Sequence, residues 1–162
     1  MNAKRIGLIA GVAAAVFLLD RLTKSIVVAT IPLYEHREVI GPYLRISHVP
    51  NSGAAFGLAQ DRAGLLSILS IFAVLAILYY YRTIAMNSPW IAGTLGMQLG
   101  GALGNLVDRI GQGYVVDFID VGIPDGPRFW SFNVADSSIV VGIFLVTFLL
   151  WLSERQRPSP AT

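Results

Sequence analysis

The sequence predicts an all-α membrane protein with four transmembrane helices, a small extracytoplasmic β-rich element and a short interfacial helix. Of its 162 residues, 54% are hydrophobic and only 14% are charged, which is too apolar for a water-soluble domain of this size. The apolar residues gather in four long stretches, separated by two longer loops that contain proline and glycine. We therefore expect residues 1–162 to form a single integral membrane domain.

The first predicted transmembrane helix covers about residues 6–28. A short basic segment precedes it, an arrangement that a cleaved secretory signal peptide shares. An uncleaved helix is favoured, because no convincing small-residue cleavage site follows and three more apolar stretches come later. Asp20 and Lys24 are four residues apart, so they lie on one face of this helix and can neutralise each other.

The first loop, about residues 30–63, mixes polar residues with prolines. Residues 43–49 carry large and β-branched side chains, which predict a short strand. The sequence Asn51-Ser52-Gly53 predicts a turn. The apolar residues 54–58 predict a short helix lying on the bilayer, with Phe56 as an interfacial anchor.

The second and third predicted transmembrane helices cover about residues 64–82 and 90–108. The second ends in three tyrosines and an arginine, a composition typical of the membrane interface. The third contains Gly96, Gly100 and Gly104, whose spacing of four lets neighbouring helices approach closely. These glycines do not indicate a phosphate-binding loop, since no strand precedes them and no Lys-Ser/Thr ending follows.

The fourth predicted transmembrane helix covers about residues 136–153. Four crossings place both termini on one side of the membrane and both loops, about 30–63 and 109–135, on the other. Lysine and arginine are denser in the short segments on the side of the termini, and the second loop is net acidic. The positive-inside rule therefore predicts cytoplasmic termini and extracytoplasmic loops.

Half of the acidic residues fall in the stretch 105–136, between two segments apolar enough to lie in lipid. These residues are Asp108, Asp117, Asp120, Asp125 and Asp136. Carboxylates at membrane depth are costly, and the cost points to a function. Asp117 lies in the β-forming segment 114–121, which can return it to the membrane surface. Asp136 precedes the last apolar stretch, where it can cap the helix, and a helix N-terminus also stabilises a carboxylate.

Our hypothesis is that Asp117 and Asp136 form one site, whereas Asp120 and Asp125 are solvated loop residues. Two carboxyl groups that share a site cannot easily both ionise, so one keeps a proton at neutral pH. Such a pair can deprotonate a water that attacks a peptide carbonyl and can donate a proton to the carbonyl oxygen. The residues thus supply an acid and a base without a metal or cofactor.

A further polar group lies at the end of the third predicted helix. Asn105, Asp108 and Arg109 are three and four residues apart and are expected to share one helix face. Asp108 is interpreted as a structural partner of Arg109 or Asn105. Arg109 either extends to the interface, balanced by Asp108, or helps to organise the nearby carboxylates.

Composition disfavours several other classes of protein. The chain has no cysteine and two histidines, so neither a thiolate nor a histidine-rich metal site is expected. Its basic residues are scattered, so nucleic-acid binding is not indicated.

The alternative function is a small proton- or ion-conducting transporter, in which Asp20, Asp108 and Asp136 line a polar path. A serine protease using Ser137 or Ser138 with Lys24 is disfavoured, because the serines begin a helix and Lys24 has a nearer partner.

Five motifs occur in order along nearly the whole chain. They are Asp20-Arg21-Leu22-Thr23-Lys24, Asn51-Ser52-Gly53-Ala54-Ala55-Phe56-Gly57, Gly104-Asn105-Leu106-Val107-Asp108-Arg109, Val115-Val116-Asp117-Phe118 and Phe132-Asn133-Val134-Ala135-Asp136-Ser137. With these motifs the sequence resembles the lipoprotein signal peptidases, also called signal peptidase II. That family consists of bacterial membrane aspartyl proteases with four transmembrane helices. Pro50 differs from the histidine expected before the second motif, and Arg128-Phe129-Trp130 is a variable approach to the last.

The resemblance implies that Asp117 and Asp136 are the catalytic dyad of an enzyme of the bacterial cytoplasmic (inner) membrane, with its active site near the extracytoplasmic surface. Other residues are implied to line or support this site: Asn51, Gly53, Asn105, Arg109, Asn133, Asp20, Lys24 and Asp108. The implied substrate is a prolipoprotein whose cysteine bears a diacylglyceryl group, cut on the amino side of that cysteine. We expect a monomer in contact with membrane lipid, with no cofactor, metal or nucleic-acid partner.

Overall fold

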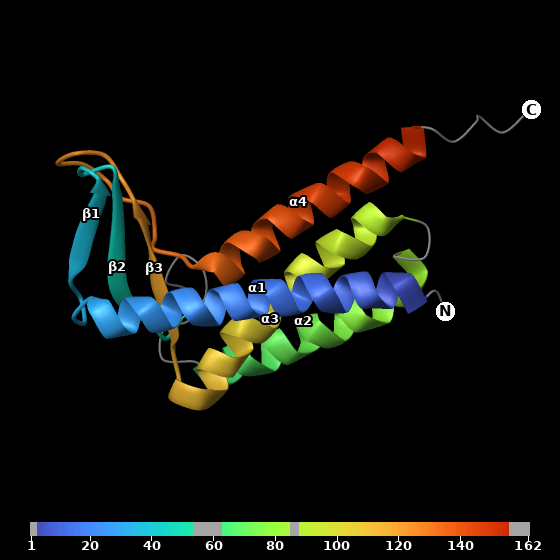
Figure 1. The fold of residues 1–162 in the computed structure, drawn as a ribbon, viewed down its shortest axis with the longest axis horizontal. Coiled ribbons are helices and arrows are strands. Elements are labelled where there is room, and N and C mark those ends of the chain that lie inside the picture. The colour runs from blue at the N-terminus through green and yellow to red at the C-terminus, as the bar shows by residue number, and fades with distance from the viewer. Residues whose placement is uncertain (1–2, 54–62, 85–87, 156–162) are drawn as a thin grey trace, which may run out of the picture.

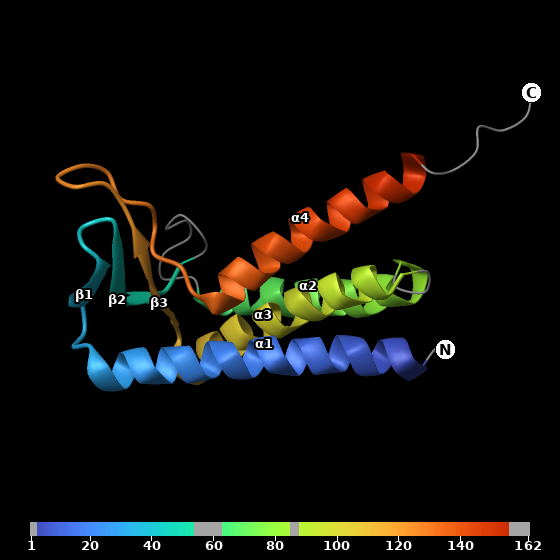
Figure 2. The ribbon, with the colours of Figure 1, turned by 45° about the horizontal axis from the view of Figure 1, so that its top comes forward.

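A computed structural model describes residues 3–53, 63–84 and 88–155. In chain order the elements are α1 (Ala3–Thr30), β1 (His36–Ile40), β2 (Leu44–Asn51), α2 (Ala63–Ile84), α3 (Pro89–Gln112), β3 (Val115–Val121) and α4 (Val134–Arg155). The helices run roughly along one direction and the three strands stand at one end of them (Figure 1). Figure 2 shows that α1 begins and α4 ends at the opposite end of the molecule.

Each of the four apolar stretches is helical, as predicted. Among the described residues, two helices, α1 and α4, are long and apolar enough to cross a membrane. The apolar part of α2, Gly64–Tyr79, is shorter. The four helices are therefore confirmed, whereas four membrane crossings stay a prediction.

The helix α3 packs against α1, α2 and α4. Its glycines allow the close approach to α1 that the sequence predicts. A Cβ atom on Gly96 would lie 2.8 Å from the Cβ of Val12, and one on Gly100 would lie 2.5 Å from the backbone oxygen of Ala13. The backbones of α1 and α3 could not approach this closely with larger residues at these positions.

The C-terminus of α3 directs the chain into the sheet. Gly113 follows the helix with φ 80°, a left-handed conformation that glycine adopts without steric cost. Its N–H donates to the carbonyl of Arg109 at 3.1 Å. The chain then turns directly into β3.

The sheet is antiparallel with the order β1-β2-β3. The predicted strands 43–49 and 114–121 correspond to β2 and β3, whereas β1 was not predicted. In the register of β2 and β3, Asn51 pairs with Val115 and Val49 with Asp117. The predicted interfacial helix 54–58, with its anchor Phe56, lies outside the described residues.

Both β2 and β3 contact α1, and β3 also contacts α3. Val116 and Phe118 are buried and pack together with Val27 near the end of α1. Since side chains alternate along a strand, the intervening Asp117 is directed away from this apolar contact. Packing of β3 on α1 thus fixes the position of the Asp117 carboxyl group.

Candidate active site

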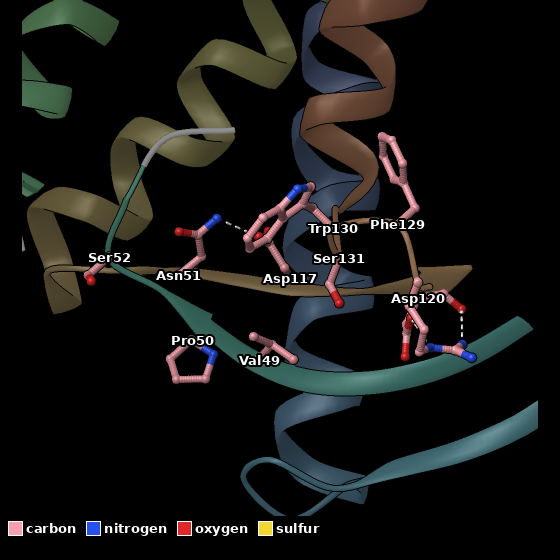
Figure 3. Close-up of a pocket in the computed structure, with 10 residues that line it drawn as sticks. Val49, Pro50, Asn51, Ser52, Asp117, Asp120, Phe129, Trp130 and Ser131 are labelled. Carbon is pink, nitrogen blue, oxygen red and sulfur yellow. Dashed lines mark hydrogen bonds and ion pairs between the residues drawn. The ribbon is translucent and has the colours of Figure 1, made fainter. Parts of the chain in front are cut away.

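Asp117 lies in the middle of β3 and is buried, with a relative exposure of 2%. Two asparagine side chains donate hydrogen bonds to its carboxylate. The Nδ2 of Asn133 lies 2.7 Å from Oδ1, and the Nδ2 of Asn51 lies 2.8 Å from Oδ2. Figure 3 shows Asn51 directed toward Asp117 from the end of β2. Both carboxylate oxygens are therefore positioned by amide groups.

The surroundings of Asp117 change its acidity. Burial, and to a smaller extent the charge of Asp136, raise the pKa of Asp117 to about 7. The hydrogen bonds from Asn51 and Asn133, together with the charge of Lys24, act in the opposite direction. Because burial dominates, this carboxyl group exchanges its proton near neutral pH.

Asp136 lies in the first turn of α4, but it is not the N-cap residue that the sequence predicted. The N-cap is Asn133, whose Oδ1 accepts the backbone N–H of Asp136 at 2.9 Å. The Oδ2 of Asp136 in turn accepts the backbone N–H of Asn133 at 3.3 Å. This reciprocal pair is a capping box with Asp136 at its third helical position. The remaining oxygen, Oδ1, accepts the Nδ2 of Asn105 at 2.7 Å.

Asp117 and Asp136 line one cavity of about 430 Å³, which we call the dyad cavity. Asn51 and Arg109 line the same cavity, and Val140 and Val141 extend it along α4. The structure thus places in one cavity two carboxyl groups that are 19 residues apart in the sequence (136 minus 117). Both carboxyl groups therefore lie in the wall of one cavity, and their joint catalytic role stays a prediction.

Arg109 and Gly53 meet on one side of the dyad cavity. The Nη2 of Arg109 lies 3.5 Å from the carbonyl oxygen of Gly53, and its Nη1 lies 3.5 Å from the Oγ of Ser70 in α2. The N–H of Gly53 donates to the Oδ1 of Asn51 at 2.9 Å. This bond orients the Asn51 amide so that its Nδ2 group faces Asp117.

A second group of carboxylates lies between α1 and α3. We call Asp20, Arg21, Lys24 and Asp108 the ion-pair cluster. The Nζ of Lys24 lies 2.7 Å from an oxygen of Asp20 and 2.7 Å from an oxygen of Asp108, which also pairs with Arg21. The predicted pairing of Asp20 with Lys24 is confirmed. The prediction that Asp108 partners Arg109 or Asn105 is wrong, because Asp108 faces α1 while Arg109 faces Ser70 and Gly53.

The ion-pair cluster contacts the site at two points. The Oδ1 of Asp20 accepts the backbone N–H of Ala135 at 3.0 Å, in the first turn of α4. The Nζ of Lys24 donates to the Oδ1 of Asn105 at 2.9 Å. With its oxygen engaged by Lys24, Asn105 presents its Nδ2 group to Asp136. The ion-pair cluster therefore orients the Asn105 amide, which donates to Asp136, and also bonds to the first turn of α4, the helix that carries Asp136.

Sequence analysis did not identify the site residues Phe129, Trp130 and Ser131, which line the dyad cavity. The presence of two large aromatic residues in a polar loop just before the last motif was the available signal. The prediction that Asp120 is solvated is wrong, since its Oδ1 lies 2.7 Å from the Nε of Arg128 and its side chain is 14% exposed. Asp125 is exposed, as predicted.

Within residues 3–53, 63–84 and 88–155, no group of three or more histidine, aspartate or glutamate side chains could hold a metal ion. The polar groups that line the dyad cavity include the two carboxyl groups, the amide of Asn51 and the guanidinium group of Arg109. Asn105 and Asn133 are not among its lining residues, but their amides donate hydrogen bonds to the two carboxyl groups.

Comparison with known proteins matches residues 12–152 to the model of a family described as Signal peptidase (SPase) II. The Lipoprotein signal peptidase of Syntrophomonas wolfei is 40% identical over 148 residues, covering 90% of this chain and 94% of the relative. That of Halothermothrix orenii is 37% identical over 142 residues, covering 86% and 92%. A solved structure described as a bacterial membrane enzyme, obtained by the in meso method, is 32% identical with a TM-score of 0.85, covering 97% of this chain and 96% of that one.

Proposed function

We propose, from the fact that this chain belongs to the signal peptidase II family, that it removes the signal peptide from prolipoproteins. Its substrate carries a diacylglyceryl group on cysteine, and the cut falls on the amino side of that cysteine. The enzyme is an aspartic endopeptidase in which Asp117 and Asp136 form the catalytic dyad.

The observation that carries this proposal is the setting of the two carboxyl groups. They line one cavity, and in the described part of the chain their hydrogen-bond donors are asparagine amides and a backbone N–H. An amide stabilises a carboxylate without fixing it in the ionised form as strongly as an ion pair does. The two groups can therefore share one proton near neutral pH, where the pKa of Asp117 lies.

The proposed reaction follows from that shared proton. The ionised carboxylate takes a proton from a water molecule, whose oxygen forms a bond to the scissile carbonyl carbon. The protonated carboxyl donates its proton to the carbonyl oxygen. When the intermediate collapses, the carbon–nitrogen bond breaks and the amine leaves with the proton that the first carboxyl took from water. A hydroxyl of the intermediate returns its proton to the second carboxylate as the carbonyl re-forms. The sum is hydrolysis of one peptide bond, with the dyad returned to its starting state.

The surroundings of the dyad suit a substrate that remains in a membrane. Val140 and Val141 extend the dyad cavity along α4, one of the two described helices that can span a bilayer. Acyl chains can remain beside such a surface while the scissile bond reaches the dyad. We propose four crossings of the bacterial inner membrane by a monomer, with cytoplasmic termini and the site near the extracytoplasmic surface.

The transporter alternative finds less support. It requires Asp20 and Asp108 to line a polar path together with Asp136. Asp20 and Asp108 are instead buried against Lys24, with relative exposures of 0% and 2%, and neither lines the dyad cavity. These buried ion pairs are suited to joining α1 to α3 rather than to conducting ions.

The test is cleavage of a diacylglyceryl prolipoprotein by the purified protein in detergent. We expect the wild-type protein to cleave it and both Asp117→Asn and Asp136→Asn to fail. Asp125→Asn is the matched control, since Asp125 is an exposed residue of the same loop region. Turnover retained by either dyad variant would refute the assignment of Asp117 and Asp136 as the catalytic dyad, because one carboxyl group cannot supply both proton transfers.

A further inference from the structure

A second cavity, of about 400 Å³, adjoins the dyad cavity. We call it the sheet cavity. The two cavities share five wall residues, namely Asn51, Asp117, Phe129, Trp130 and Ser131. Figure 3 shows Asp117 between Asn51 on one side and Asp120 on the other, with the sheet cavity lined by β2 below them. A chain bound at Asp117 can therefore extend into both cavities.

The two cavities continue in different directions and differ in character. Beyond the shared wall, the dyad cavity reaches Val140 and Val141 on α4. The sheet cavity instead reaches Ser52, Asp120 and Arg128, beside the sheet at the end of the helices. A substrate whose acyl chains and apolar signal peptide lie along α4, and whose polar mature segment leads away from the helices, fits this order.

Asp120 and Arg128 form the polar wall of the sheet cavity. In addition to the 2.7 Å ion pair, the Nη1 of Arg128 donates to the carbonyl of Pro42 at 2.8 Å, and its Nη2 donates to the carbonyl of Asp120 at 3.2 Å. The Oγ of Ser47 lies 3.3 Å from the Oδ2 of Asp120. The two opposite charges hold each other in place and leave the wall without net charge.

We propose that the sheet cavity binds the mature polypeptide that follows the lipidated cysteine, and that the Asp120–Arg128 pair keeps this subsite indifferent to the sign of the substrate's charge. This inference rests on the proposed function. It assigns to two residues a role in specificity that is separate from the cleavage chemistry.

The position of Asp120 indicates which substrate residue it faces. Asp120 is three residues beyond Asp117 along β3, and both residues line the sheet cavity. The regular alternation is broken between them, since the N–H groups of Phe118 and Ile119 both donate to the carbonyl of Phe132 in the manner of a β-bulge. A strand advances about 3.3 Å per residue, so the two residues are roughly 10 Å apart along the strand. An extended substrate whose scissile bond lies at Asp117 covers the same length with three residues. The third residue of the mature chain therefore meets the pair.

The experiment measures cleavage of three lipidated substrates that differ only in Glu, Gln or Lys at the third mature residue. The readout is the ratio of kcat/KM for the Glu substrate to that for the Lys substrate. In the wild-type protein we expect a ratio close to one. Asp120→Asn keeps an acceptor for Arg128 but leaves its positive charge uncompensated, which should raise the ratio by at least about fivefold.

Arg128→Gln leaves the charge of Asp120 uncompensated and should lower the same ratio by a similar factor. The double variant Asp120→Asn/Arg128→Gln removes both charges, so its ratio should return toward one. High salt should reduce the shifts of the single variants, since the cavity is open to solvent ions.

Glu154→Gln is the control. It removes an exposed carboxylate near the C-terminal end of α4, at a residue that lines neither cavity. Its ratio should equal that of the wild-type protein. Moving the charged residue to the eighth mature position, beyond the reach of the pair, should likewise abolish the shifts.

The outcomes separate the two proposals. Absence of cleavage by the wild-type protein, or retained cleavage by Asp117→Asn, would refute the proposed function. Efficient wild-type cleavage with no change of ratio in either single variant would overturn the subsite alone. If one single variant loses cleavage of all three substrates, the ratio of the other decides, because each variant predicts a shift of opposite sign.

Discussion

Two pairs of carboxyl groups, all buried except the half-buried Asp136, differ in the groups that face them. In the ion-pair cluster, the Nζ of Lys24 lies 2.7 Å from both Asp20 and Asp108. In the dyad, Asp117 and Asp136 accept hydrogen bonds from asparagine amides. A nearby cation favours the ionised form of a carboxyl group, whereas an amide leaves protonation more readily accessible.

This difference in surroundings indicates a structural role for the ion-pair cluster and a chemical role for the dyad. The ion-pair cluster joins α1 to α3 and, through Asp20, reaches the first turn of α4. The dyad holds carboxyl groups whose protonation can change. Asn105 links the two regions, because it accepts from Lys24 and donates to Asp136. The ion-pair cluster thus orients, through Asn105, one of the two carboxyl groups proposed to exchange a proton.

The largest expected effect comes from removing the titratable groups of the dyad. Asp117→Asn and Asp136→Asn should each lower kcat for a lipidated prolipoprotein by about 10³-fold or more, since both proton transfers depend on the pair. Thermal unfolding in detergent should show that both variants remain folded. If a dyad variant unfolded at a much lower temperature than the wild-type protein, the dyad would have a structural role like that of the ion-pair cluster, and the proposed difference between the two would be contradicted.

The next effect concerns stability. Lys24→Met leaves Asp20 and Asp108 facing each other without the shared cation, which should cost roughly 3–5 kcal/mol of unfolding free energy. Denaturant unfolding in a fixed detergent measures this cost. Adding Asp20→Asn removes one uncompensated charge and keeps an acceptor for Ala135, so the double variant should recover part of the loss. Equal stability of Lys24→Met and wild type would contradict a structural role for the cluster.

The third prediction uses the acidity of Asp117. Because its pKa is raised to about 7, from an ordinary value near 3.8, the folded protein binds this proton more tightly than the unfolded chain does. The contribution to stability is fully present below about pH 4 and is lost as pH rises to 7. Asp117→Asn does not titrate, so its stability relative to wild type should increase from pH 4 to 8, by up to roughly 4 kcal/mol.

The measurement is a series of unfolding midpoints across that pH range. Asp125→Asn serves as the control, since an exposed carboxyl group should change the pH dependence little. A constant difference between Asp117→Asn and wild type from pH 4 to 8 would refute the raised pKa.

The smallest effect is a shift in a pH profile. Cleavage should decline as pH rises through about 7, because the shared proton is lost from the dyad. The hydrogen bond from Asn51 lowers the pKa of Asp117, so Asn51→Ala should raise it and move the descending limb of kcat/KM to higher pH. Movement of that limb to lower pH would contradict the assignment of the limb to Asp117.

Much of the fold was predictable because long apolar stretches are a strong local signal. The predicted segment 136–153 and the observed α4, Val134–Arg155, differ by two residues at each end. The strand β1 was missed because His36–Ile40 is a mixed segment, and the strand is exposed along its whole length. Edge strands of this kind lack the alternation that marks a half-buried strand.

The sequence-based predictions that were wrong at the site concern which groups a residue contacts, not which residues lie there. Asp108 and Arg109 are adjacent in sequence, yet successive residues of a helix point about 100° apart, so they face different neighbours. The Asn133-x-x-Asp136 spacing of a capping box was present in the sequence, but Asp136 was assigned as the cap itself. The pairing of Asp120 with Arg128 depends on a turn that brings the two residues together.

The sequence by itself determined the apolar helices, the closely packed glycines of α3 and the identity of the two candidate catalytic carboxyl groups. These features depend on residue type and short-range spacing, which the chain states directly. Only the tertiary structure decided which carboxylates face a cation and which face amides, because those contacts join residues from α1, α3, β2, β3 and α4. Whether a buried carboxyl group holds a structure together or moves a proton depends on those distant partners.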